Sequence, residues 1–507
     1  MNKNEAASKL QFLWQAQITL FFVGIQFMLR EIQCVETQNN VNVGVGFATG
    51  RKNFIKVLES QFDNWQKCGL LADSTINISI FIAYDTSYNN VDAEEFMKVP
   101  DRIKDGLSAI HFIGKDEVDE TVNKLRAEGI ISEYEIRELF GDHEYHKLRN
   151  NILFAALEQK MDYLLFLDDD EYPFIPLKNE KTGELEWLEQ NILQTHLRYI
   201  QDHDVTFGYH CGYISPIPFF QFGEEIAEKD FKNFIEAVSN DIISWSKMKK
   251  LMADNKGITY PDEAIVKNLP TKQLVSRNGV KWFAGSNICL NLTRLKNVAA
   301  FYNPPNARGE DTFFCACVRG KSVLRIPAYS FHDGFLKYPE ILDGEFPKAL
   351  QAVEYSDEEV KQRFFKACVG WLRYKPLLLY VIDKQQCRTK SVLDTITYAQ
   401  KIRAVKSQLK SSITQISAIL DMESFLQVKV ELDFYASEVQ THYKQFQRVQ
   451  ANWKKITEKL VAMPMVEDLP MPSISLENFE SAETVEELAE TILLTCEVLN
   501  QARYFLL

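Results

Sequence analysis

The most constraining feature of this 507-residue sequence is an alternation of strand-like and helix-like segments that begins near residue 42. Three short apolar segments have the character of strands, namely Val41 to Gly50, Ile76 to Asp85 and Ala109 to Gly114. Helix-like segments separate them, and residues 116–160 are expected to be mainly helical. Alternation of this kind is typical of βα units, so we expect an α/β fold with a mainly parallel sheet and flanking helices.

The next expected strand ends in a run of acidic residues. The segment YLLFLDDDEYPF, Tyr163 to Phe174, places five apolar or aromatic residues directly before four consecutive carboxylates. Ligands of open α/β sheets bind beyond the carboxyl ends of the strands, so these carboxylates are expected to face a cleft. A divalent cation would offset their mutual repulsion, and on an extended backbone Asp168 and Asp170 would point to the same side. The alternative is that the run is only a solvated strand end.

Charge and cysteine content narrow the class of protein. The formal net charge of −13 argues against a nucleic-acid binder, because phosphate backbones are held by clustered basic residues. The nine cysteines are odd in number and lack CxxC spacing, so neither a disulfide framework nor a zinc site is expected. Cysteines without a disulfide pattern favour a reducing compartment, and we expect a cytoplasmic protein.

The segment HKLRNNILFAALEQKMDYLLFLDDDEYPF, His146 to Phe174, resembles the helix, strand and Asp-x-Asp segment of GT-A nucleotide-sugar glycosyltransferases. The resemblance rests on motif order over about residues 40–340 and implies a GT-A (Rossmann-like) fold. It also implies that Mn²⁺ or Mg²⁺ binds at Asp168 and Asp170, and that Arg149 and Asp169 lie in the donor site. The implied donor is a UDP- or GDP-linked sugar, and the acceptor is a glycan, lipid or protein.

Two later motifs follow in the order that this family requires. PPNARGEDTFF, Pro304 to Phe314, resembles the Gly-Glu-Asp segment of inverting members, which makes Asp311 the expected general base with Glu310 beside it. Both acids would equally suit the first turn of a helix. In YSFHDGF, Tyr329 to Phe335, the position of His332 resembles the third metal ligand of many GT-A enzymes, although a lone histidine is often structural.

Further donor-site residues are expected from their positions. GVKWFAGSNICLNL, Gly279 to Leu292, resembles the family's strand beneath the donor sugar, with a bend of small residues. The turn after the first strand and the end of the second strand flank the nucleoside in such enzymes. The expected residues are Gly285, Ser286 and Asn287 at the bend, and Thr49, Arg51 and Asp85 at the strand ends. The last three would also serve as ordinary turn residues.

The two ends of the chain differ from this middle region. Residues 10–30 are expected to form an amphipathic helix that docks on the protein or on a partner. The alternatives are a helix at a membrane interface and a type II membrane anchor. No glycine or proline occurs from Leu377 to Met463, so this stretch should be nearly all helix, an interaction or oligomerisation module. The expected parts are 1–40 (helix or anchor), 41–340 (GT-A domain), 341–463 (helical module) and 464–507 (linker and last helix).

The expected function is therefore a metal-dependent, inverting glycosyltransferase. Two other classes stay open. A phosphatase of the haloacid dehalogenase type also carries Asp-x-Asp after an apolar strand, but Tyr172 stands where such enzymes usually have Thr or Val. A non-catalytic helical scaffold with a degenerate GT-A domain is the other alternative.

Overall fold

The computed structural model describes residues 40–462, apart from 180, 215, 224–225, 239–244, 278, 295–297 and 387–396. The described residues up to Glu458 form one compact unit, and a second begins at Lys459. The expected helix at residues 10–30 and the expected linker and helix at 464–507 lie outside the described residues. The helical region up to Glu458 therefore shares its compact unit with the sheet.

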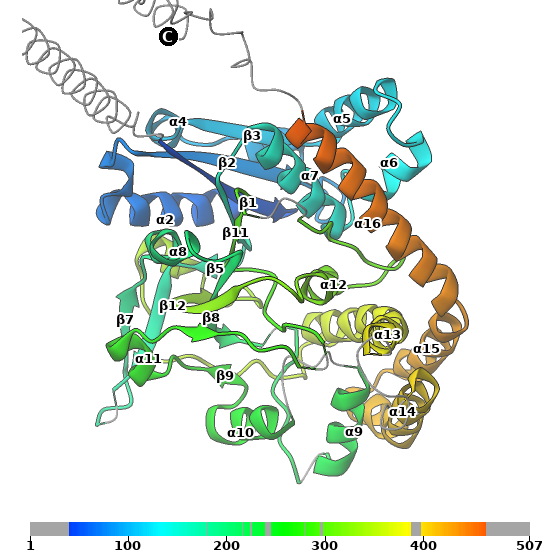
Figure 1. Ribbon diagram of the computed structural model, residues 1–507. Helices are drawn as coiled ribbons and strands as arrows, with labels where there is room; N and C mark the ends of the chain where they lie inside the picture. Colours follow the sequence, from blue (N-terminus) through cyan, green and yellow to red (C-terminus); the bar gives the residue numbers. More distant parts are fainter. Residues whose placement is uncertain are drawn as a thin grey trace, which may run out of the picture. The chain divides into compact units, whose positions relative to one another are not determined.

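A curled, mixed β-sheet forms the centre of the first unit (Figure 1). Its main path runs in the order β10-β12-β8-β11-β4-β1-β2-β3, with β5 paired to β12 and β9 paired to β8. The strands are β1 (Val41–Thr49), β2 (Ile76–Tyr84), β3 (Ala109–Ile113), β4 (Tyr163–Leu167), β5 (Glu171–Tyr172), β8 (Val205–Tyr213), β9 (Ile258–Thr259), β10 (Lys272–Gln273), β11 (Ile288–Asn291) and β12 (Val323–His332). A separate two-stranded sheet pairs β6 (Phe174–Lys178) with β7 (Leu185–Glu189).

The four strands expected from the apolar segments are confirmed as β1 to β4. They pair in parallel, β3 with β2, β2 with β1 and β1 with β4, so their carboxyl ends meet at one edge. The whole sheet is mixed rather than plainly parallel, because β11 runs antiparallel to both β4 and β8. The expected strand in Gly279 to Leu292 is reduced to four residues, and the small-residue bend before it lies outside the ladder.

Strand β8 has no counterpart among the expected strands. Two glycines, Gly208 and Gly212, interrupt its apolar pattern, and the sheet explains the first of them. A Cβ at Gly208 would collide with the side chain of Asn287 and the carbonyl oxygen of Ala328. Gly208 therefore allows neighbouring strands to approach closely. The sequence around this glycine does not reveal that role.

Most helices before the long carboxyl-terminal ones cover the sheet or lie at its margins, whereas α9 (Glu228–Val238) packs against two of the long ones (Figure 1). These earlier helices are α2 (Phe54–Lys67), α3 (Ala93–Met97), α4 (Asp101–Gly106), α5 (Lys115–Ala127), α6 (Glu133–Leu139), α7 (Tyr145–Glu158), α8 (Ile192–Ile200), α9, α10 (Trp245–Asn255), α11 (Glu263–Asn268) and α12 (Glu310–Cys317). The mainly helical character expected for residues 116–160 is confirmed by α5, α6 and α7.

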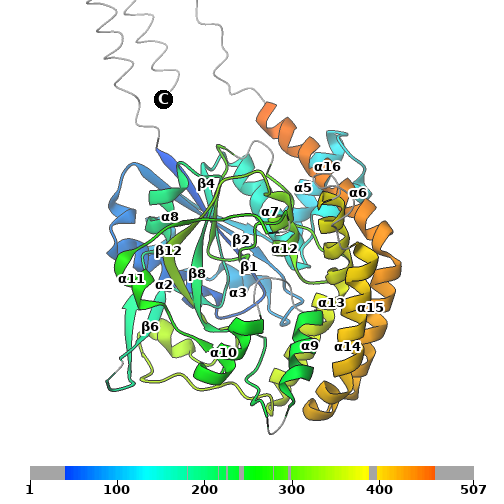
Figure 2. The same cartoon turned by 60° about the horizontal axis from the view of Figure 1, so that its bottom comes forward.

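The expected helical region is also confirmed, within the residues described. It consists of α13 (Glu358–Gln386), α14 (Tyr398–Leu420), α15 (Val428–Ser437) and α16 (Val439–Ala462). α14 packs against α9, and α13 packs against α15 and α12, as both views show (Figure 1, Figure 2). None of the described helices is long and apolar enough to cross a membrane.

Candidate functional site

The four acidic residues after β4 lie in a tight turn, here called the acidic turn (Asp168 to Glu171). The backbone N–H of Glu171 donates to the carbonyl oxygen of Asp168 over 3.3 Å, so the alternation expected of an extended backbone does not apply. Basic side chains from other elements lie beside all four carboxylates. The pairs are Asp168 with Arg149, Asp169 and Asp170 with Arg51, and Glu171 with His210. The protein's own basic groups therefore offset the repulsion that the sequence implied.

Asp168 is held by α7 and by the bend before β11. Arg149 Nη2 lies 3.0 Å from Asp168 Oδ1, and the Tyr145 hydroxyl donates to the same oxygen. The backbone N–H of Asp168 donates to Ser286 Oγ over 3.0 Å, and Arg149 Nη1 donates to the carbonyl oxygen of Gly285. The structure thus brings four of the expected site residues into direct contact, and Tyr145 joins them.

The loop after β1 binds the middle of the acidic turn. Thr49 Oγ1 donates to Asp169 Oδ2 over 2.6 Å, and Arg51 Nη1 lies 3.1 Å from Asp169 Oδ1 and 2.8 Å from Asp170 Oδ2. Burial raises the pKa of Asp169 to about 6, although Arg51 acts against that shift. Burial also opposes ionisation of Asp170, but Arg51 and His332 outweigh it and hold the pKa of that carboxyl well below its usual range. Asp170 is therefore a firmly ionised carboxylate.

His332, at the end of β12, faces Asp170. Its Nδ1–H donates to the carbonyl oxygen of Tyr213 over 2.8 Å, and its Nε2 lies 3.5 Å from Asp170 Oδ1. Burial lowers the pKa of the imidazole, but the Asp170 charge outweighs this and raises that pKa to about 9. A histidine with one nitrogen fixed by a carbonyl and the other turned toward a carboxylate resembles the setting of metal-binding histidines. Asp170 and His332 offer an oxygen and a nitrogen of the kinds that manganese accepts, and the imidazole would have to lose its proton to bind such an ion.

The candidate ligands for a metal ion are therefore Asp170 and His332. Within the described part of the chain, no group of three or more His, Cys, Asp or Glu side chains is arranged as a metal site. Asp168 Oδ1 already accepts bonds from Arg149 and Tyr145, so Asp168 would contribute to a shared ion chiefly through its other oxygen.

Glu310 and Asp311 open helix α12, as expected. A Cβ placed on Gly285 would lie 2.7 Å from Asp311 Cβ and 3.1 Å from Arg149 Nη1, so this glycine lets Asp311 approach the arginine that binds Asp168. Burial raises the pKa of Asp311 to about 7, and the charge of Glu310 acts in the same direction. A carboxyl group with such a pKa can accept a proton near neutral pH.

Two expected donor-site residues have structural contacts instead. Asn287 is fully buried; its Oδ1 lies 2.8 Å from His196 Nε2, and its amide donates to the carbonyl oxygen of Ala328 over 3.2 Å. These bonds tie neighbouring strands together beneath the site. Asp85 accepts bonds from the backbone N–H and the hydroxyl of Ser87, at 2.8 and 2.6 Å, and so organises the loop after β2.

Three residues of the site were not expected from the sequence: Tyr145, His210 and Arg363. Tyr145 lies one helical turn before Arg149, and this spacing could have indicated it. His210 belongs to the unpredicted strand β8 and Arg363 to helix α13, so only the tertiary structure brings them near. Burial, and after it the nearby charge of Arg51, lowers the pKa of Arg363. The helical region thus contributes a basic residue to the surroundings of the acidic turn.

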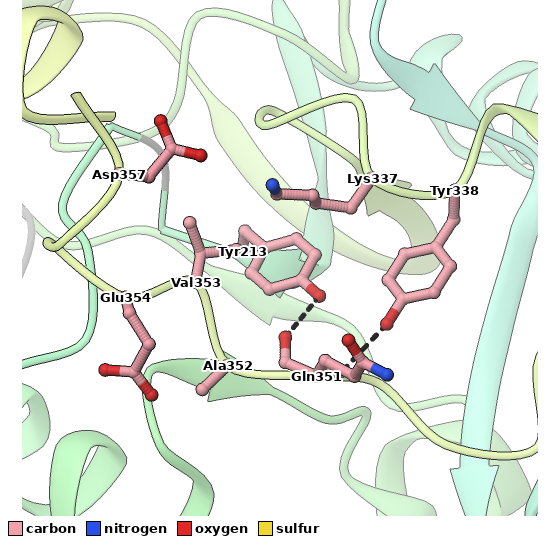
Figure 3. Close-up of a pocket in the computed structure, with 8 residues that line it drawn as sticks. All are labelled: Tyr213, Lys337, Tyr338, Gln351, Ala352, Val353, Glu354 and Asp357. Carbon is pink, nitrogen blue, oxygen red and sulfur yellow. Dashed lines mark hydrogen bonds between the residues drawn. The ribbon is translucent and has the colours of Figure 1, made fainter. Parts of the chain in front are cut away.

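A pocket of about 310 Å³ is lined in part by Tyr213, whose carbonyl oxygen accepts the bond from His332 (Figure 3). Its lining residues are Tyr213, Lys337, Tyr338, Gln351, Ala352, Val353, Glu354 and Asp357. The Tyr213 hydroxyl donates to the carbonyl oxygen of Gln351 over 2.7 Å, and the Gln351 N–H donates to the Tyr338 hydroxyl over 2.7 Å. The tyrosines are therefore fixed, and Lys337 extends between Tyr338 and Asp357.

Comparison with known proteins gives no family: no family model matches the sequence, and no curated protein matches it.

Proposed function

We propose that this protein is a metal-dependent glycosyltransferase of the GT-A type, which moves a sugar from a nucleotide-diphosphate donor to an acceptor hydroxyl with inversion. The observation that carries the proposal is the meeting of Asp168, Arg149 and Asp311 around Gly285, at the carboxyl end of β4. A metal-site aspartate, a cation that orients it and a base are groups that such a transfer can use, and three separate segments supply them.

In the proposed reaction Asp311 accepts the proton of the acceptor hydroxyl while the hydroxyl oxygen attacks the anomeric carbon. The bond from that carbon to the diphosphate oxygen breaks on the opposite face, and the nucleoside diphosphate leaves with the bonding electrons. Arg51 places a guanidinium group beside the acidic turn, where it can bind phosphate oxygens, and the buried Arg149 orients Asp168. Asp170 and His332, with Asp168, would hold Mn²⁺ or Mg²⁺, and such an ion would supply Lewis-acid stabilisation of the departing diphosphate.

The decisive experiment is calorimetry with UDP, GDP and their sugars in Mn²⁺. We expect Asp168→Ala and Asp170→Ala to abolish metal-dependent binding while the protein stays folded. Asp162→Asn is the matched control: Asp162 lies just before β4, at the end of the strand away from the acidic turn, and accepts the N–H of Asn42 over 2.8 Å. This control should bind normally. Undiminished metal-dependent binding by both site variants would refute the proposal.

The same protein preparation distinguishes the alternative functions. A phosphatase would hydrolyse p-nitrophenyl phosphate in Mg²⁺ without binding the nucleotides. A non-catalytic scaffold would do neither. Binding of one nucleoside diphosphate in Mn²⁺, without hydrolysis of the simple ester, is the result expected of the transferase, and it also identifies the nucleoside.

A further inference from the structure

The segment from Val298 to Gly309, here called the base loop, leads directly into Glu310 and Asp311, and α16 binds its first half. Trp453 Nε1 donates to the carbonyl oxygen of Val298 over 2.8 Å. The Gln450 side chain pairs with both backbone groups of Ala300: it accepts the N–H over 3.1 Å and donates to the carbonyl oxygen over 2.9 Å. Two side chains of one helix thus hold the start of the base loop by its backbone.

Helices α13 and α15 bind the second half of the base loop. The Tyr435 hydroxyl donates to the carbonyl oxygen of Pro305, and Arg373 Nη1 donates to that of Asn306 over 3.0 Å. The backbone N–H of Arg308 in turn donates to the carbonyl oxygen of Gly370 over 3.1 Å. Contacts from three helices therefore follow the loop to the residue before Gly309.

The end of the base loop is fixed by steric fit. Gly309 has φ of +129°, a conformation that side chains disfavour, and a Cβ there would lie 2.7 Å from the ring of Tyr374 in α13. Asp311 follows two residues later, in the first turn of α12. The position of its carboxyl group therefore depends on a loop whose backbone is held by the helical region.

We infer that the helical region positions the catalytic base: Gln450, Trp453 and Arg373 are positioning residues that hold the base loop, and through it Asp311, in the geometry for proton transfer. This inference rests on the proposed function. It assigns to α13–α16 a part in the site itself, in place of the appended interaction module that the sequence suggested. A base displaced by about 1 Å can cost about 100-fold in rate, so bonds far from the chemistry can control turnover.

The test compares Gln450→Met with Arg448→Met, both on α16. Met keeps the size of the glutamine but removes its donor and acceptor. Arg448 bonds to Glu138 of α6, and these hydrogen bonds and this ion pair do not involve the base loop. The readouts are nucleotide affinity in Mn²⁺, release of UDP or GDP from the sugar nucleotide that the wild type uses, and hydrogen exchange of residues 298–309.

We expect Gln450→Met to lower kcat by at least about 10-fold, to leave nucleotide affinity within 2-fold, and to speed hydrogen exchange in the base loop. Arg448→Met should change neither kcat nor exchange in this loop. In the Asp311→Asn background, Gln450→Met should cause no further loss, because the base it positions is already removed. A purely structural role would instead lower activity in both backgrounds.

The outcomes separate this inference from the proposed function. A wild-type protein that binds no sugar nucleotide in Mn²⁺ overturns the proposed function and, with it, the role given to the helical region. A wild type that binds and turns over, together with a Gln450→Met variant of normal kcat and normal loop exchange, overturns only the positioning role.

Discussion

At the residue scale, Asp311 is expected to carry the chemistry because its surroundings match the task of a base. Asp311→Asn removes the proton acceptor but keeps the size of the side chain, so the rate of transfer should fall by about 10² to 10⁴ with donor affinity nearly unchanged. Since the pKa of Asp311 is raised to about 7 and the base acts when deprotonated, the wild-type rate should rise with pH up to about 7 and then level. Initial rates between pH 5 and 9, with calorimetry of the donor, measure both effects.

The product and the pH profile decide whether Asp311 has this role. The wild-type product should have inverted anomeric configuration, and the Asn variant should lose the rise in rate near pH 7. Retained configuration contradicts the assignment. Near-normal turnover of Asp311→Asn would transfer the role to Glu310 or another acid.

The raised pKa of Asp311 also makes the free energy of unfolding depend on pH. Between the unfolded pKa near 3.9 and the folded value of about 7, the folded protein binds more protons than the unfolded chain. The free energy of unfolding therefore falls as pH rises through this window.

At the scale of an element, helix α12 depends on the glycine before it. We expect Gly309→Ala to destabilise the protein by about 1 to 3 kcal/mol, because a Cβ would be strained at φ +129° and would strike Tyr374. The substitution should also slow transfer, since α12 carries Asp311. Thermal unfolding and rates of nucleotide release measure the two effects.

Gly320→Ala supplies the control for this substitution. Gly320 follows α12, and a Cβ there would have open space around it. The variant should unfold within about 0.5 kcal/mol of the wild type. A Gly309→Ala protein as stable and active as this control would show that the conformation at Gly309 does not matter.

At the scale of the molecule, the sheet and the helical region up to Glu458 belong to one compact unit and should unfold together. Ile456, on α16, is 1% exposed, so Ile456→Ala should cost about 2 to 5 kcal/mol. Hydrogen exchange in β4 and circular dichroism should report the same shifted transition. Lys454→Ala, a half-exposed neighbour, should have little effect. If the helices unfolded at a lower temperature while the transition of the sheet stayed unchanged, the expectation of a single unfolding transition would be wrong.

The sequence by itself determined the local elements and the chemistry they carry. The apolar segments at β1 to β4 and the long stretch without glycine or proline predicted strands and helices, because periodicity depends only on neighbouring residues. The acidic run after β4 and the acids at the start of α12 were also expected, because each is a short motif next to a recognisable element.

Only the tertiary structure decided which groups meet. Arg51 and Arg149 form ion pairs with the acidic turn, and His210 lies beside Glu171. Thr49 binds Asp169 from 120 positions away. Three further features result from contacts between segments that are distant in the sequence. They are the antiparallel direction of β11, the formation of strand β8, and the hydrogen bonds from the helical region to the base loop. Such contacts depend on strand pairing and packing across the whole molecule, and local sequence patterns carry no record of them.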